Sequence, residues 1–427
     1  MYSPDELKKL IESADFSMAL SSIYYSDYPM LSYQKRRYAR VIDKYVKHFD
    51  ENIFGIFSAP GRTEIGGNHT DHQHGQVLAA SVNLDAIAIV GPAEDNRITI
   101  ASSGYGEIIV DLDDISPKEE EFGTSVALVK GIVRGFVKKQ LNVGPFRAYI
   151  TSDVISGSGL SSSAAFEVLI GSILSGMYNN MRITPKGIAV IGQYAENRYF
   201  GKPCGLMDQM ACSLGGFSHI NFSDPTRPVV ETISFNLSAH GYSLCIIDTK
   251  ASHADLTDDY SRIPSEMKLI ANHFEKNFLG DVSPDDFYNH LPELKGTVSH
   301  RAILRALHFF DENIRVAEEV SALKENNIHG FLNAVQKSGD SSFKYLQNVY
   351  SSKNIDFQPL SLALAYSEHL LKDRGVCRIH GGGFAGTIQA FIKSSYVNTY
   401  KTEIEKVFGK NTCHILHIRE RGITKML

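Results

Sequence analysis

A segment rich in glycine and serine constrains the fold of this chain more than any other stretch. The segment S-G-S-G-L-S-S-S-A-A-F, residues 156–166, follows a strand-like run and precedes an apolar run with helical periodicity. Gly157 and Gly159 allow the backbone to turn tightly, and Ser161, Ser162 and Ser163 fall where the helix is expected to begin. Free amides and the helix dipole favour an anion there, although a serine-rich helix N-cap needs no ligand. The segment therefore predicts strand, loop and helix, with a phosphate site as one of two interpretations.

The rest of the sequence excludes two other interpretations of this segment. The phosphate-binding pattern G-x-x-x-x-G-K-[ST] occurs nowhere in the chain, and neither does the G-x-S-x-G pattern of a serine nucleophile. A serine hydroxyl at the helix N-terminus can instead ligate Mg²⁺, which prefers oxygen ligands and bridges phosphates.

Two further stretches carry candidate site residues. In A-E-N-R-Y-F-G-K-P-C-G-L-M-D-Q-M, residues 195–210, Asp208 follows a Pro-Cys-Gly turn and is a candidate general base. Glu196, on the preceding predicted helix, could complete a Mg²⁺ site with a serine, although surface exposure is the ordinary state of either carboxylate. The segment H-G-G-G-F-A-G-T-I-Q-A-F, residues 380–391, indicates close backbone approach or a tight bend between two strands.

A run of histidines in A-P-G-R-T-E-I-G-G-N-H-T-D-H-Q-H-G, residues 59–75, suggests a metal site at first sight. The histidines lie in a loop broken by glycines rather than at i, i+4 of a helix, which argues against zinc. Arg62 follows a predicted strand and could support a phosphate or an ionised hydroxyl. His69 and Asp71 suit a sugar, which needs several directional polar partners.

Composition narrows the class of protein. The chain has 427 residues, 43% hydrophobic and 21% charged, with a net charge of −5, which is typical of a globular protein of two or three domains. We expect neither nucleic acid nor a membrane as partner. The N-terminus lacks an apolar leader, and the five cysteines show no C-x-x-C spacing, so we expect a reducing, cytoplasmic location. That location also excludes glycosylation at Asn68.

Periodicity predicts an α+β fold in two parts. Residues 1–50 are expected to form helices, with Tyr38, Val41, Ile42, Tyr45 and Val46 on one apolar face. Strands are expected in 53–60, as pairs within Q-V-L-A-A-S-V-N-L-D-A-I-A-I-V-G-P, and in R-I-T-I-A-S, E-I-I-V-D-L and F-R-A-Y-I-T-S-D. Helices dominate 258–375, so the chain divides into a strand-rich N-terminal part, 1–215, and a helix-rich C-terminal part, 216–427.

The order of these motifs resembles the galactokinase branch of the GHMP small-molecule kinases. P-G-R…H-T-D-H, G-S-G-L-S-S-S-A-A, G-K-P-C-G-L-M-D-Q and H-G-G-G-F-A-G follow one another as in that family, over roughly residues 30–425. The resemblance implies two GHMP kinase domains with the active site in the cleft between them. It also implies ATP, Mg²⁺ and phosphorylation of a hexose, galactose first, at the C1 hydroxyl, by an enzyme we expect to be a monomer.

The resemblance also assigns roles to individual residues. It implies that Asp208 is the catalytic carboxylate, that Arg62 pairs with it, and that Ser163 and Glu196 hold Mg²⁺. The residues expected to contact the ATP phosphates are Gly157, Ser158, Gly159, Leu160, Ser161, Ser162 and Ser163. The residues expected to contact the sugar are Arg62, Asn68, His69, Asp71, Gly205, Asp208 and Tyr260.

Three positions near His69 depart from the family pattern G-R-V-N-L-I-G-E-H-T-D-Y. Glu64 replaces an asparagine, Asn68 a glutamate that typically holds the sugar's 6-hydroxyl, and His72 a tyrosine. A kinase for a sugar altered at C6, such as galacturonate, is therefore an alternative to a galactokinase. S-V-A-L-V-K-G, residues 125–131, also lacks the family's tryptophan near the nucleotide base, so the nucleotide donor stays open. A sensor that binds sugar and ATP without catalysis is a third hypothesis, opposed by the intact loop at 157–163.

Overall fold

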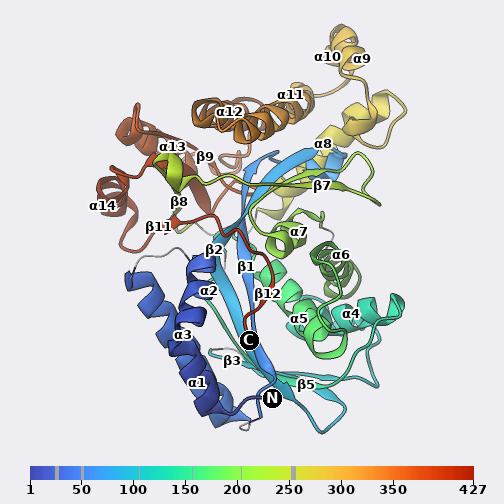
Figure 1. Cartoon of the computed structure of the whole chain (residues 1–427). Helices are drawn as coiled ribbons and strands as arrows, with labels where there is room; N and C mark the ends of the chain where they lie inside the picture. Colours follow the sequence, from blue (N-terminus) through green and yellow to red (C-terminus); the bar gives the residue numbers. More distant parts are fainter. Residues whose placement is uncertain (25–27, 50–51, 105, 156, 203, 252–255) are drawn as a thin grey trace.

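The computed structural model of the chain describes residues 1–24, 28–49, 52–104, 106–155, 157–202, 204–251 and 256–427 (Figure 1). Ser156 and Pro203, which belong to stretches quoted above, lie outside the described residues. Two sheets organise the fold. The first has the order β12-β1-β2-β5-β3-β4, with β6 paired to β2 and β7 to β6, and the second has the order β11-β8-β10-β9.

The described part of the chain contains both strands and helices along its length. The strands are β1 Gly55–Gly66, β2 Gln76–Pro92, β3 Arg97–Ser102, β4 Ile108–Asp111, β5 Phe146–Ser152, β6 Phe217–Asn221, β7 Val229–Ile233, β8 Tyr242–Asp248, β9 Gly375–Ile379, β10 Thr387–Lys393, β11 Cys413–Leu416 and β12 Thr424–Lys425. The helices are α1 Pro4–Glu12, α2 Ala14–Tyr24, α3 Tyr28–His48, α4 Ser125–Lys138, α5 Ser162–Tyr178, α6 Pro185–Ala195, α7 Met207–Leu214, α8 Thr257–His273, α9 Pro284–Asn289, α10 Leu291–Thr297, α11 His300–Lys324, α12 Ile328–Ser341, α13 Pro359–Leu371 and α14 Val397–Phe408. This mixture confirms the predicted α+β class.

The β1–β2 hairpin forms the centre of the molecule and is covered on both faces (Figure 1). Successive side chains of a strand point to opposite sides of the sheet. Ile56 and Ile87 accordingly pack into a cluster with the N-terminal helices α1–α3, whereas Phe57 and Ala88 join the main core with α4, α5 and α6. The hairpin is therefore a rigid, fully buried support for the residues at its end.

The N-terminal helices are amphipathic as predicted. Tyr38, Val41, Ile42 and Tyr45 of α3 are buried, and Val46 packs beside them. A charged cluster adds to this apolar contact: Asp85 of β2, fully buried, lies 2.6 Å from Arg37 of α3 and 2.9 Å from Arg419 near the C-terminus. Burial raises the pKa of Asp85, but the two guanidinium groups lower it more, so the carboxylate stays charged.

One expectation about the strands is wrong. Q-V-L-A-A-S-V-N-L-D-A-I-A-I-V-G-P forms a single strand, β2, rather than a pair. Between Gln76 and Val90 the segment contains no Gly or Pro, and it pairs with β1 along one edge while β6 and β5 share the other edge. Complete pairing on both edges stabilises a strand of this length.

The first sheet takes strands from both sides of residue 215. β6 and β7, just past that position, extend β2, and β12 near the C-terminus pairs with β1. The division into 1–215 and 216–427 therefore stays a prediction. Among the described residues, no helix combines the length and the apolar character needed to cross a membrane.

Candidate active site

An arginine–aspartate pair lies where the end of β1 meets the beginning of α7. Arg62 Nε donates to Asp208 Oδ1 at 2.8 Å, and the terminal nitrogen Nη2 lies 2.7 Å from the same oxygen. The Asp208 side chain is 32% exposed, whereas that of Arg62 is 9% exposed. The carboxylate can therefore reach a ligand while the arginine supports it from behind.

The surroundings of Asp208 keep it ionised. Burial raises the pKa of this carboxyl, but the Arg62 charge and hydrogen bonds from Ser161 and Arg62 lower it to below its usual value. Ser161 Oγ donates to the second oxygen, Oδ2. An ionised carboxylate held at a defined angle can accept or orient a hydroxyl proton.

The predicted phosphate loop, residues 157–163, contacts the same pair. Arg62 donates through its amide to the Leu160 carbonyl at 3.0 Å and through its guanidinium to the Gly159 carbonyl. Gly157, with φ +76°, has open space where a Cβ would lie. No side chain in the described part of the chain caps α5, so the amides of its first turn are available to an anion.

The two predicted Mg²⁺ ligands differ in their surroundings. Ser163 lies in the first turn of α5. Glu196 begins a π-helical turn after α6 and is buried; Gln209 donates to it at 2.7 Å and Lys202 at 3.2 Å. Beside it, one carboxylate oxygen of Glu167 is buried without a hydrogen-bond partner among the residues that the structure describes.

The composition of this site fits Mg²⁺ better than zinc. Its donors are oxygens, and Mg²⁺ commonly uses one or two protein ligands together with water and phosphates. Among the described residues, no three His, Cys, Asp or Glu side chains are grouped as a metal site would need.

Residues 64–74, which we call the signature loop, are fixed by hydrogen bonds at Asn68. The side-chain nitrogen Nδ2 of Asn68 donates to Glu64 at 2.8 Å and to the Gly381 carbonyl at 2.7 Å. The side-chain oxygen Oδ1 accepts from Asn348 at 2.7 Å. Its backbone carbonyl accepts from His308 at 2.9 Å. Asn68 is fully buried, so a direct contact with a sugar would require one of these bonds to be exchanged.

The structure brings two departures from the family pattern into direct contact. Glu64 and Asn68 are hydrogen-bonded to each other, so the carboxylate and the amide have exchanged positions relative to that pattern. Arg378 of β9 lies 3.2 Å from the Glu64 carboxylate. Burial raises the pKa of Glu64 to about 7, although Arg378 and Arg62 oppose the rise.

The predicted sugar contacts His69, Asp71, Gly205 and Tyr260 surround the third glycine-rich loop, residues 380–386, and the turn before α7. His69 Nε2 lies 2.9 Å from the Gly382 carbonyl, and Tyr260 donates to the Gly383 carbonyl at 2.6 Å. A Cβ at position 205 would lie 2.4 Å from Asp71 Oδ2, so a larger residue there would have to displace the Asp71 carboxylate. The Asp71 side chain therefore lies against the turn that leads to Asp208.

Several residues that sequence reasoning missed support the site. Glu312 of α11 accepts from the Gly67 amide at 3.0 Å. His380 lies 3.0 Å from Thr63 Oγ1 and 2.9 Å from Thr387 Oγ1, and Gln389 donates to Thr63 at 2.6 Å. Of these, only Glu312 stands in ordinary helix sequence without a local signal; the others lie within the stretches 59–75 and 380–391, which gave them no individual role.

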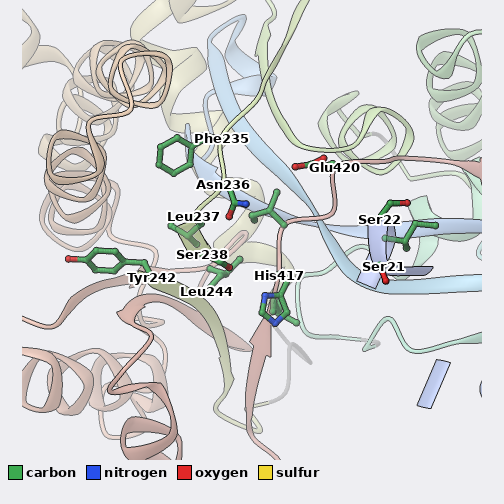
Figure 2. Close-up of a pocket in the computed structure, with 13 residues that line it drawn as sticks. Ser21, Ser22, Phe235, Asn236, Leu237, Ser238, Tyr242, Leu244, His417 and Glu420 are labelled. Atoms are coloured by element: carbon green, nitrogen blue, oxygen red, sulfur yellow. The ribbon is translucent and has the colours of Figure 1, made fainter. Parts of the chain in front are cut away.

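A separate cavity has a volume of about 260 Å³. Figure 2 shows the side chains that line it. Its walls come from α2, the connection between β7 and β8, β8 itself and the segment after β11. None of the predicted site residues lines this cavity. The glycine-rich loops around Arg62 and Asp208 are therefore the better candidate for the active site.

Comparisons with known proteins agree with this choice. The family model of the GHMP kinase N-terminal domain matches residues 127–216, and the galactokinase galactose-binding signature matches residues 43–92. The galactokinase of Glaesserella parasuis serovar 5 is 30% identical over 374 residues, which cover 86% of this chain and 93% of the relative. The galactokinase of Lactobacillus helveticus is 28% identical with the same coverage.

Solved structures share the fold. The crystal structure of Lactococcus lactis galactokinase complexed with galactose superposes with a TM-score of 0.77 at 22% identity and covers 91% of this chain and 100% of that one. Methanococcus jannaschii mevalonate kinase gives a TM-score of 0.59 at 13% identity, covering 85% and 98%. The same architecture therefore occurs in kinases named for different small molecules.

Proposed function

Because this chain belongs to the galactokinase family of GHMP kinases, we propose that it transfers the γ-phosphoryl group of ATP to the C1 hydroxyl of galactose. The observation that carries this proposal is the ionised Asp208, bonded to Arg62 and Ser161 at the edge of the phosphate loop. A sugar hydroxyl beside Asp208 would lie between a proton acceptor and a site for phosphates. The product would be galactose 1-phosphate.

In the proposed mechanism, the protein mainly positions groups and balances charge. Phosphoryl transfer needs little covalent help from a protein, so orientation and electrostatic stabilisation supply most of the rate. Asp208 orients the C1 hydroxyl and accepts its proton, while Arg62 stabilises the charge that develops nearby. The amides and hydroxyls of residues 157–163 hold the phosphates of ATP.

We propose that Ser163 and Glu196 hold Mg²⁺ in the working enzyme. When bound, the ion would neutralise charge on the phosphates. The support from this chain is the oxygen character of both ligands, together with the unpartnered Glu167 oxygen beside Glu196. Lys202, paired with Glu196 in the structure, would move away to admit the ion.

The proposed sugar site consists of Asn68, His69, Asp71, Gly205 and Tyr260 together with the Arg62–Asp208 pair. Asp71 offers the sugar a carboxylate, and Asn68 acts through the hydrogen bonds that shape the loop. Cytoplasmic location, a monomeric state and ATP as the preferred nucleotide stay predictions.

A second candidate is a kinase for a sugar altered at C6. The observation that favours it is the exchange of Glu64 and Asn68, which leaves an amide, bonded within the protein, where the family pattern has a carboxylate. Without a carboxylate at position 68, the site would repel an anionic group at C6 less strongly.

One experiment separates these hypotheses. The purified chain is given ATP, Mg²⁺ and, in turn, galactose, galacturonate, glucose, N-acetylgalactosamine and arabinose. ADP release gives kcat/KM, and ³¹P NMR identifies the phosphorylated carbon. We expect galactose to be the best substrate, phosphorylated at C1. A higher kcat/KM for galacturonate would replace galactose by a C6-altered sugar, and no ADP release with any sugar would support a sensor.

A further inference from the structure

A chain of hydrogen bonds runs through the signature loop and includes His72 and Gln73, which the proposed chemistry leaves without a role. The Leu279 amide donates to Gln73 Oε1 at 3.1 Å, and Gln73 Nε2 lies 3.4 Å from His72 Nδ1. His72 Nε2 lies 3.2 Å from His69 Nδ1, and His69 Nε2 lies 2.9 Å from the Gly382 carbonyl. The chain thus links a turn of the C-terminal part to the third glycine-rich loop.

The direction of every bond in this chain is determined by its two ends. A backbone amide can only donate and a backbone carbonyl can only accept. Gln73 therefore accepts from Leu279 with its oxygen and turns its NH₂ group toward His72. At the other end, His69 must present Nε2–H to Gly382. Both rings complete the chain only as neutral imidazoles that carry their proton on Nε2 and accept at Nδ1.

The surroundings of the two rings agree with neutral imidazoles. Burial, followed by the neighbouring His72, lowers the pKa of His69 to about 3, although the Gly382 carbonyl and Asp71 oppose the change. Burial lowers the pKa of His72 to about 4. Beyond these groups, His308 also faces His69 and disfavours its charge. A proton added to either ring would set two donors against each other in the chain.

We propose that His72 is a positioning residue of the sugar site: it fixes His69 in the neutral Nε2–H form that holds the third glycine-rich loop against the signature loop. This inference rests on the proposed function for its effect on sugar binding. Both nitrogens of His69 are occupied by the chain, so His69 offers the sugar its ring rather than a free nitrogen. Hydrogen bonding to the sugar at this side then falls to Asp71.

The proposal is tested with three variants and histidine NMR. His72→Phe keeps a ring but removes both nitrogens, and His72→Gln keeps a neutral acceptor and donor in the same order. His74→Phe is the matched control, because His74 stacks on Phe278 outside the chain. In protein labelled with ¹⁵N-histidine, each variant and the wild type are titrated from pH 5 to pH 9, and the His69 signals are assigned by difference.

We expect wild-type His69 to show a protonated Nε2 and a bare Nδ1 throughout this range. The same signals should persist in His72→Gln and His74→Phe and should be lost in His72→Phe, where His69 can change tautomer or take up a proton. An Nδ1–H tautomer or a charged ring in the wild type near pH 7, or an unchanged spectrum in His72→Phe, would overturn the proposal.

Kinetics test the consequence for the sugar site. In His72→Phe the KM for galactose should rise roughly 5- to 10-fold, as expected for the loss of one or two hydrogen bonds, while kcat changes less than about 2-fold. His72→Gln should restore most of the wild-type KM. A KM unchanged in His72→Phe would refute the positioning role. If the wild type fails to phosphorylate galactose, the proposed function fails, whereas the NMR result still decides the tautomer.

Discussion

In the signature loop every polar side-chain atom of Asn68 is bonded to another part of the protein, whereas in the phosphate loop Gly157 faces open space. The phosphate loop contacts both Arg62 and Asp208 and leaves amides free at the start of α5, whereas the signature loop, which follows Arg62 in the chain, is held by the hydrogen bonds of Asn68. A site for a neutral sugar gains from preorganised groups. A site for phosphates gains from donors that are free until the anion arrives.

The largest effect is expected where the two loops meet. Asp208→Asn keeps the shape of the side chain but removes the proton acceptor, so kcat should fall by about 10²–10⁴-fold. Galactose binding, measured by calorimetry without ATP, should survive because the signature loop is unchanged. A variant with near-wild-type kcat would remove Asp208 from the chemistry.

Two buried glutamates of α11, near the signature loop, differ in whether their carboxylates form hydrogen bonds. Glu312 is fully buried, accepts from the Gly67 amide and lies 2.7 Å from Arg315; Glu319 is also fully buried, but neither of its carboxylate oxygens has a partner among the described residues. Glu312→Gln should lower the free energy of unfolding by about 3 kcal/mol at pH 7. Glu319→Gln should change it by less than about 1 kcal/mol at pH 7, because no hydrogen bond is lost.

In the wild type, Glu312 and Glu319 make the free energy of unfolding depend on pH with opposite signs. Burial raises the pKa of Glu312, but His308, Arg315 and Arg378 lower it to about 2, so stability from this group falls as pH drops from 4.5 toward 2. Burial and the nearby Glu312 raise the pKa of Glu319 to about 8, so the folded state retains a proton that the unfolded state releases, and stability falls as pH rises from 4.5 toward 8. Urea unfolding from pH 2 to pH 9 measures both slopes, and each Gln variant should lack the slope of the group that it replaces.

An intermediate effect is expected when the exchange of Glu64 and Asn68 is reversed in steps. Asn68→Glu places a second carboxyl against Glu64 and removes the donor to the Gly381 carbonyl, so the KM for galactose should rise about 100-fold. Adding Glu64→Gln supplies an amide opposite the new carboxylate and should recover at least about 10-fold. If the double variant is no better than Asn68→Glu, the two residues do not act as a pair.

The smallest effects are expected from substitutions of two glycines, Gly205 beside the signature loop and Gly157 in the phosphate loop. Gly205→Ala forces a methyl group against Asp71 Oδ2, and the KM for galactose should rise about 10-fold while the KM for ATP stays constant. Gly157→Ala meets open space and suffers only from its positive φ, so the KM for ATP should rise about 3-fold with galactose binding intact. Steady-state kinetics with each substrate varied in turn would show whether the two loops are independent.

Local sequence predicted the central parts of the site but not their support. The glycines and serines of 157–163, together with Arg62 and Asp208, belong to motifs whose local pattern carries their chemistry. Glu312, Asn348 and Arg378 reach the signature loop from α11, the segment after α12 and β9. Their contacts depend on how distant elements pack, which no local pattern encodes. The length of β2 was misread for a related reason, since three partner strands determine it.

The pairing of β12 with β1 has a consequence for how the chain folds during synthesis. β1 carries Arg62 and leaves the ribosome early, but one edge of this strand waits for residues 424–427, whose backbone bonds to Ile56 close it. Arg419, which pairs with the buried Asp85, also arrives late. Until residues 419–427 have been made, a nascent chain therefore exposes an unpaired strand edge, and Asp85 has Arg37 but not Arg419 as a cationic partner. Ribosome stalling late in translation should leave a species prone to aggregation, and chaperones would have to protect β1 during that interval.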